Sequence, residues 1–423
     1  RATAFVNVAK GRLVHAIFVG DVSQGKPLSL ASFLELNRDE PNGRKYPGVV
    51  YLNSFDRIDT DQAVFGQLAY DITDNLELTV GARFFKPEVT VDGFFGFGLG
   101  FSPARAPSGS EPGAVANGGS GAFSPVGQGW SRNGEYRCKS QASYNDAPCR
   151  NVNKGIAESE NIGRVNLRWT VNDDVMLYAT WSEGYRPGGI NRNPFAGDYI
   201  SDFLTNYELG WKTTWFDNRL QFNGALFLQS WDDFQISFQG ANGITQVANG
   251  PSAEVNGLET QLQWLATDSL LLSATAAFYD SELKNDYANF DAAGNVVSVN
   301  APKGTQLPIT PKFKGNVVAR YSFNLGSFDA HLQGSVAHSG KAPSRLALDA
   351  NAIIGDIEAN TTADLSAGIG KDNYTIELFV QNVGNEDAAL YKTSQCAESV
   401  CGVQPYGVRP QPRTIGLKFT QKF

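Results

Sequence analysis

The sequence lacks any run of eighteen consecutive apolar residues, and its mean hydropathy is −0.26. A transmembrane helix needs about 20 predominantly apolar residues to cross the hydrocarbon core, so a helical membrane protein is excluded. Basic residues are also scarce, because 35 Lys and Arg stand against 43 Asp and Glu and leave a net charge of −8. Nucleic acid rewards clustered Lys and Arg, so no nucleic-acid partner is expected.

The residue types that carry most site chemistry are few. The chain has one Met and three His, and His15, His331 and His338 lie far apart in the sequence. Their spacing forms neither a metal-binding set nor a catalytic triad. The glycine-rich stretch 93–100 lacks the spacing of a phosphate loop. We therefore expect no catalytic residue, no metal site and no cofactor, and hence no enzyme.

Only four Cys are present, and they form two local pairs, Cys138 with Cys149 and Cys396 with Cys401. Both pairs lie in polar stretches, which favours two loop disulfides in an oxidising compartment. Four free thiols in a cytosolic protein is the alternative. The first residue is Arg, and an exported protein is expected to have carried a signal peptide that was removed or that lies outside this sequence, so its absence does not argue against export.

The dominant pattern is alternation of apolar and polar residues, as in 75–84, 164–171, 208–212 and 316–321. Strand side chains alternate between two faces, so each segment predicts a strand with one apolar and one polar face. A soluble β-sandwich and a transmembrane β-barrel both produce this pattern. In a barrel, the lipid-facing residues would include Leu76, Leu78, Val80, Val165, Leu167 and Trp169.

Two features favour the barrel. The polar face carries Arg, Glu, Lys, Asn and Gln together, whereas the apolar face is rich in aromatic residues that suit girdles at the membrane interfaces. The Trp residues near strand ends are Trp169, Trp181, Trp211, Trp215 and Trp264. The chain also closes with the alternating segment 414–423, which ends in Phe423 and resembles the assembly signal of outer-membrane barrels.

The third feature is the alternation of short and long connections, which is typical of bacterial barrels with short periplasmic turns and long extracellular loops. The expected short turns lie at 73–75, 172–174, 217–218, 267–268, 325–326 and 371–373. The expected long loops span 88–158, 185–203, 237–253, 284–311, 340–358 and 383–412.

The predicted fold class is therefore all-β, a transmembrane antiparallel β-barrel. Thirteen strands are expected from Gln62 to the end, within a barrel region at 62–423. Residues 1–61 are expected to add a partial barrel strand around 12–20 and then an extracellular loop. A transporter barrel of 22 strands has more strands than this chain can supply. We expect the chain to be the C-terminal portion of such a barrel, without the plug domain.

Six segments in order resemble the TonB-dependent outer-membrane receptor family. They are 62–67 with 75–83, then 182–191 (SEGYRPGGIN), 206–212 (NYELGWK), 255–259 (VNGLE), 380–383 (VQNV) and 412–417 (PRTIGL). The resemblance implies an active uptake receptor in the outer membrane of a Gram-negative bacterium. The implied ligand is a ferric siderophore or another large, scarce nutrient.

The resemblance also implies three kinds of partner. These are outer-membrane lipid, the external nutrient, and the TonB energising complex, which would act through an N-terminal region absent from this chain. Two other functions stay open. A passive porin-like channel would conduct ions, and an outer-membrane enzyme would need a nucleophile and a base projecting from facing strands.

Ligand contacts are expected in the long loops and the upper lumen, because only these reach an external solute. The candidates are Tyr185, Arg186 and Asn191 beside the Pro-Gly-Gly segment, and Trp130, Arg132 and Tyr136 in the longest loop. The alternative is that Pro187-Gly188-Gly189 only shapes a turn and that these residues are ordinary loop polarity.

Overall fold

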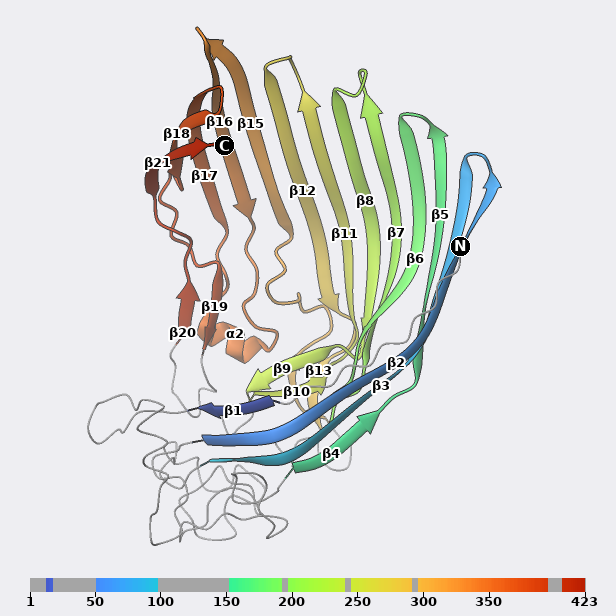
Figure 1. Cartoon of the computed structure of the whole chain (residues 1–423). Helices are drawn as coiled ribbons and strands as arrows, with labels where there is room; N and C mark the ends of the chain where they lie inside the picture. The colour runs from blue at the N-terminus through green and yellow to red at the C-terminus, as the bar shows by residue number, and fades with distance from the viewer. Residues whose placement is uncertain are drawn as a thin grey trace, which may run out of the picture.

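The computed structural model of the chain describes residues 13–17, 51–97, 152–191, 197–239, 245–290, 296–394 and 405–422. Its main element is one antiparallel sheet of fifteen strands, which runs as a curved wall across Figure 1. Along the sheet the strands are β1 (Leu13–Ile17), β2 (Tyr51–Thr73), β3 (Leu76–Phe97), β5 (Glu160–Asn172), β6 (Val175–Arg186), β7 (Asp202–Trp215), β8 (Leu220–Asp232), β11 (Ala253–Leu265), β12 (Leu270–Leu283), β15 (Phe313–Leu325), β16 (Phe328–Ser339), β17 (Asn360–Lys371), β18 (Tyr374–Gln381) and β21 (Thr414–Gln421). The strand β4 (Val152–Ala157) pairs with β3 beside this path.

The strand count agrees with the sequence prediction, because the path from β2 to β21 contains the expected thirteen strands and β1 lies within 12–20. Among the described residues, no helix combines the length and the apolarity needed to cross a membrane.

Short turns gather at one end of the sheet, called here the turn end, and long connections at the other, called the loop end (Figure 1). All six predicted short turns join consecutive strands of the sheet. The last strand runs from the loop end to the turn end, where the Lys422 N–H donates to the Asn373 carbonyl at 2.8 Å. This sorting of connections is as the sequence predicts.

The long connections contain structure that the sequence analysis did not predict. They hold three two-stranded hairpins and a helix: β9 (Gln235–Gln239) with β10 (Thr245–Asn249), β13 (Tyr287–Phe290) with β14 (Val296–Ala301), β19 (Tyr391–Ser394) with β20 (Pro405–Val408), and α2 (Leu348–Ile354).

The outer face of the sheet is the one that carries Leu78. Leu78 is paired with Tyr70 and with Leu167, and Val80 with Leu68 and Val165, so the predicted lipid-facing residues share this face. Val80 is 44% exposed and Trp169 46% exposed. On β3 the apolar outer residues run from Leu76 to Phe84, which is about 27 Å at 3.4 Å per residue. Strands of an outer-membrane barrel are tilted by about 35–45°, so this stretch covers about 20 Å of height and most of the apolar band, which is about 25 Å tall.

The inner face is polar and forms ladders of hydrogen bonds between strands. Arg168 Nη2 lies 2.9 Å from Glu77 Oε2, and the Tyr178 hydroxyl donates to Glu208 at 2.5 Å. Farther along the sheet, His331 Nε2 lies 3.2 Å from Glu377 Oε2. These contacts satisfy polar groups that face away from lipid.

The two longest strands extend past the apolar band and correct two predicted boundaries. β2 begins at Tyr51 and not near Gln62, and β3 continues to Phe97 although a loop was expected from residue 88. Beyond Phe84 the alternation persists but the polarity changes sides, so that Val89 is buried on the inner face and Glu88 is exposed on the outer face. The outer face meets water there, and the inner face packs against loops.

Candidate functional site

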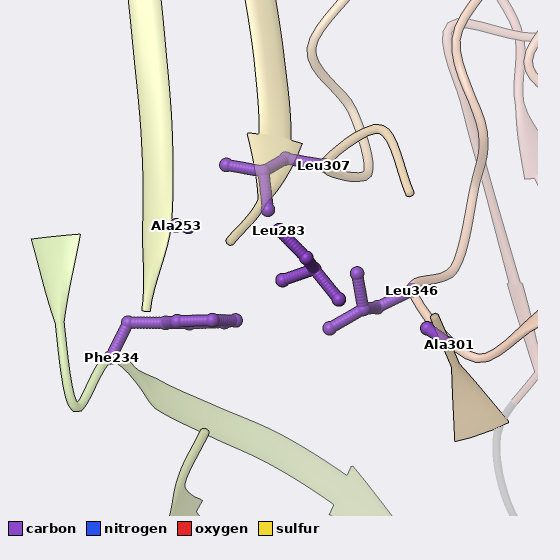
Figure 2. Close-up of a cluster of buried hydrophobic side chains, with 6 residues drawn as sticks. All are labelled: Phe234, Ala253, Leu283, Ala301, Leu307 and Leu346. Carbon is purple, nitrogen blue, oxygen red and sulfur yellow. The ribbon is translucent and has the colours of Figure 1, made fainter. Parts of the chain in front are cut away.

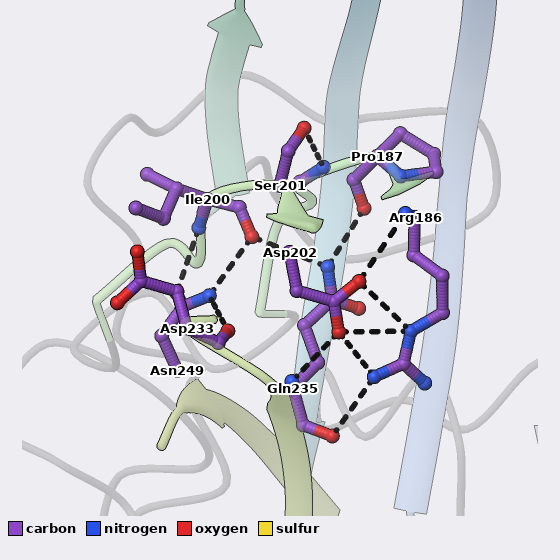
Figure 3. A network of polar contacts seen from close by, with 9 residues as sticks. Arg186, Pro187, Ile200, Ser201, Asp202, Asp233, Gln235 and Asn249 are labelled. Atoms are coloured by element: carbon purple, nitrogen blue, oxygen red, sulfur yellow. Dashed lines mark hydrogen bonds and ion pairs between the residues drawn. The ribbon is translucent and has the colours of Figure 1, made fainter. Parts of the chain in front are cut away.

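The most organised polar cluster of the loop end lies where β6 and β7 finish. Arg186 and Asp202 are cross-strand partners, and the Asp202 side chain is 2% exposed. Arg186 Nε donates to both Asp202 oxygens at 3.1 and 3.0 Å, and the Gln235 N–H donates to Oδ2 at 3.0 Å (Figure 3). The guanidinium also lies 5.0 Å over the Trp231 ring. The buried carboxylate therefore joins β6, β7 and β9.

Two asparagine amides join neighbouring loops at this end. The Asn191 side chain donates to the Val247 carbonyl at 2.7 Å and accepts from the Val247 N–H at 2.9 Å, as a strand neighbour would. Asn249 accepts from the Ile200 N–H at 2.8 Å and donates to the Asp233 carbonyl at 2.7 Å (Figure 3). The connection between β6 and β7 is thus attached to the β9–β10 hairpin.

The Pro-Gly-Gly segment is held from its other side by Glu158. One Glu158 oxygen accepts from the Gly188 N–H at 3.1 Å and from the Ser201 hydroxyl at 2.7 Å, and the other accepts from the Ser201 N–H at 2.9 Å. A Cβ on Gly188 would lie 2.6 Å from the Glu158 carboxylate and from the Tyr199 carbonyl. Glycine is required here by the close approach of these groups.

Aromatic packing fixes the ring of Tyr185. This ring stacks on Phe85 with centroids 3.8 Å apart and approaches Phe203 at 6.4 Å. Beside it, Arg83 lies 5.5 Å over the Phe85 ring and forms an ion pair with Asp61 at 2.5 Å. Tyr185 thus belongs to an aromatic and arginine cluster that spans β2, β3, β6 and β7.

An apolar core supports the loops between β8 and β17. Figure 2 shows side chains from several connections meeting around Leu283, which is fully buried. The members of this core are Phe234, Ala253, Leu283, Ala301, Leu307 and Leu346. Burial of each large member contributes about 1.5–3 kcal/mol, so this end of the molecule is packed and not only hydrogen-bonded.

A second feature of the loop end is a cavity of about 610 Å³ beside α2, lined among others by Lys312, Lys341, Arg345 and Asp356. Hydrogen bonds from Asn351 and then from Lys341 hold the pKa of Asp356 below its usual value. The Arg345 guanidinium lowers the pKa of Tyr391 through a hydrogen bond. Arg345 also lines this cavity and donates hydrogen bonds to the Ser344 carbonyl and the Thr393 hydroxyl, and no carboxylate in the described part of the chain forms an ion pair with it.

The structure places the predicted site residues unequally. Tyr185, Arg186 and Asn191 all lie at the loop end, where Arg186 and Asn191 contact the β9–β10 hairpin and Tyr185 stacks on Phe85. The Arg186 side chain is half-exposed and Asn191 is 5% exposed. Trp130, Arg132 and Tyr136 lie outside the described residues, as do the four cysteines Cys138, Cys149, Cys396 and Cys401. No group of His, Cys, Asp and Glu able to hold a metal occurs among the residues that are described.

Sequence reasoning missed Glu158, Asp202 and the residues around Arg345. Asp202 could have been found, because an acid opposite Arg186 is what a hairpin joining 175–186 and 202–215 would bring together. Glu158 gave no such signal, because its contacts with residues 188 and 201 depend on how a loop folds back.

A sheet with an apolar outer face, a polar inner face and long connections at one end is the wall of a transmembrane β-barrel. A family model described as TonB dependent receptor-like, beta-barrel, matches residues 5–383. The chain belongs to this family of outer-membrane transport receptors.

Curated relatives include the pesticin receptor of Yersinia pestis, which is 26% identical over 269 residues, covering 60% of this chain and 35% of the relative. The pesticin receptor of Yersinia enterocolitica is 27% identical over 129 residues, covering 30% of this chain and 19% of the relative. The chain therefore spans about a third or less of the length of these relatives.

Solved structures show the same fold. The ferric yersiniabactin uptake receptor FyuA from Yersinia pestis matches with a TM-score of 0.63 at 15% identity, covering 89% of this chain and 48% of that one. The ferric-catecholate import receptor Fiu from E. coli K12 matches with a TM-score of 0.58 at 16% identity, covering 88% and 46%. The copper transporter OprC matches with a TM-score of 0.57 at 16% identity, covering 88% and 49%.

Proposed function

We propose that this chain is the barrel wall of a receptor that takes up an external ligand with energy delivered through TonB. The proposed ligand class is a ferric siderophore or another large and scarce nutrient, and the proposed entry side is the loop end. Family membership supports active uptake, and the ferric-siderophore receptors among the structural neighbours support the ligand class.

The observation that carries this proposal is the order of the loop end. The connection after β6 is joined to β9 by the Arg186–Asp202 pair, and Asn191 joins it to β10. A receptor gains affinity when the groups that meet its ligand are already positioned, because less entropy is lost on binding. A passive pore has no such requirement.

The proposed ligand contacts include Tyr185, the exposed part of Arg186, and Trp130, Arg132 and Tyr136 of the longest loop. The Asn191 amide is occupied by backbone groups, so its proposed role is to position this loop. The cavity beside α2 offers Lys341 and Arg345 as additional contacts for an anionic part of the ligand.

Energised uptake needs a plug that closes the barrel and a segment that contacts TonB. We propose that the native protein carries both on the N-terminal side of these strands. A barrel of about 22 strands is wide enough to require such a plug.

The test measures accumulation of iron-loaded siderophores by cells that make the native protein, with and without a collapsed proton gradient. Energised uptake predicts that accumulation stops while binding to the cell surface persists. Accumulation that continues undiminished without the gradient would instead establish the passive channel. Cells that lack the protein provide the background.

A further inference from the structure

The outer face carries a furrow on the turn-end half of the wall, with a volume of about 460 Å³. Its floor is formed by small residues, because Ala319 and Gly334 are cross-strand partners and Ala367 lies opposite Leu332 in the next row. The furrow exists because three neighbouring strands each place Gly or Ala where a larger side chain would otherwise stand.

The walls of the furrow are large apolar side chains that remain about half exposed. Tyr321 is 47% exposed, Leu332 52%, Leu365 54% and Leu378 51%. All of them point to the outer face, and all lie within the apolar band that faces hydrocarbon in this family. A furrow left empty there would forfeit the dispersion contacts of its lining.

A positively charged side chain, Lys371, lies on β17 between the furrow and the turn end. Lys371 is four residues from Ala367 on β17, about 14 Å toward the turn end at 3.4 Å per residue. Its Nζ lies 5.7 Å over the Phe328 ring, and Tyr374 is its cross-strand partner. Within the described residues no carboxylate forms an ion pair with Lys371. Lys and aromatic residues at this depth sit at the level of lipid headgroups.

We propose that the furrow and Lys371 together form a binding site for one glycerophospholipid of the turn-side leaflet. An acyl chain occupies the line of small residues between Leu332 and Leu365, and the Lys371 ammonium contacts the phosphate. Small residues permit close van der Waals packing in a membrane, where no hydrophobic force drives association.

The pairing of an apolar slot with a cation favours a lipid over a second copy of the chain. A second copy would bring its own outer face, and the large side chains that the described residues expose within the band are apolar, so they complement the furrow but not the ammonium of Lys371. The position near the turn end also favours the leaflet in contact with the short turns.

The experiment uses the native protein in a mild detergent and counts retained phospholipids by native mass spectrometry while phosphatidylglycerol is titrated. Ala367→Phe fills the furrow, and Lys371→Gln removes the cation while it leaves the apolar surface intact. Ala363→Phe is the matched control, because Ala363 faces outward on the same strand but outside the furrow. Lys312→Gln controls for the loss of a charge at the loop end.

The wild-type protein is expected to keep one phospholipid at detergent concentrations that strip the others. Ala367→Phe is expected to lose it, and Lys371→Gln to bind it about fivefold more weakly. The two control variants should match the wild type, with folding of each variant checked by heat-modifiable gel migration. Unchanged retention by Ala367→Phe and by Lys371→Gln, equal loss in Ala363→Phe, or a second copy of the chain as the retained mass would overturn the proposal.

Discussion

At the scale of single residues, a few polar side chains at the loop end each form hydrogen bonds to two or more residues and so join neighbouring connections. Asp202 accepts from Arg186 and from the Gln235 backbone, and Asn191 takes the place of a strand neighbour for Val247. The sequence marked Arg186 and Asn191 as important but assigned them to the ligand. Arg186 contacts the carbonyl of Gln235, 49 positions away, and Asn191 contacts Val247, 56 positions away, and alternation says nothing about pairing at those distances.

Asp202→Asn should loosen the connection between β6 and β7. Loss of one partner of a buried ion pair costs about 3–5 kcal/mol, but Arg186 is 49% exposed, so we expect about 1–2 kcal/mol. Limited proteolysis should cut 187–201 faster in this variant. Asp268→Asn is the matched control, because Asp268 pairs with Arg219 while 93% exposed. Equal proteolysis of both variants would argue that the pair has no structural role.

The two disulfides remain a prediction from sequence. Pairing of Cys138 with Cys149 and of Cys396 with Cys401 should stabilise each loop by about 2–3 kcal/mol in the chain-entropy estimate. Mass spectrometry of a non-reduced digest should find both local pairs. Four free thiols or crossed pairs would contradict it.

At the scale of strands and turns, prediction from sequence succeeded where one face meets lipid and the other meets polar contacts. Leu76, Leu78 and Val80 share one face because they are two residues apart, and all three are apolar because lipid lies along that whole side of the strand. Prediction failed where the medium changes, as in β3 beyond Phe84, and where short strands such as β9 and β10 depend on partners from other loops. The local alternation of apolar and polar residues shows neither where the surroundings of a strand change from lipid to water nor which distant segment a short strand pairs with.

Some strand glycines lie directly under an aromatic ring of the adjacent strand, and these positions do not have room for a larger residue. A Cβ on Gly257 would lie 2.1 Å from the Phe227 ring of the adjacent strand, whereas nothing lies within 4 Å of a Cβ on Gly66. Gly257→Ala should therefore displace the ring and cost about 1–3 kcal/mol, whereas Gly66→Ala should be close to neutral. Urea unfolding in detergent micelles measures both. Similar midpoints for the two variants would contradict the packing argument.

At the scale of the whole molecule, the wall separates two media and sorts its connections by side. Sequence alternation and the six short turns were enough to establish this arrangement, because both recur in every hairpin. The packing of the loop end and the cavity beside α2 could not be inferred, because they arise from contacts among connections with no common period.

The most direct test of the central claim compares neighbouring positions on one strand of the wall. Leu167 faces outward and is 39% exposed, and Arg168 faces inward with a side chain 48% exposed, so a label reaches either position. Leu167→Cys and Arg168→Cys would each carry a polarity-sensitive fluorophore in the protein reconstituted into lipid vesicles. A barrel wall predicts an apolar environment with quenching by lipid-borne quenchers at 167, and a polar environment with quenching from water at 168. Equal access of the aqueous quencher to both positions would contradict a membrane-spanning wall.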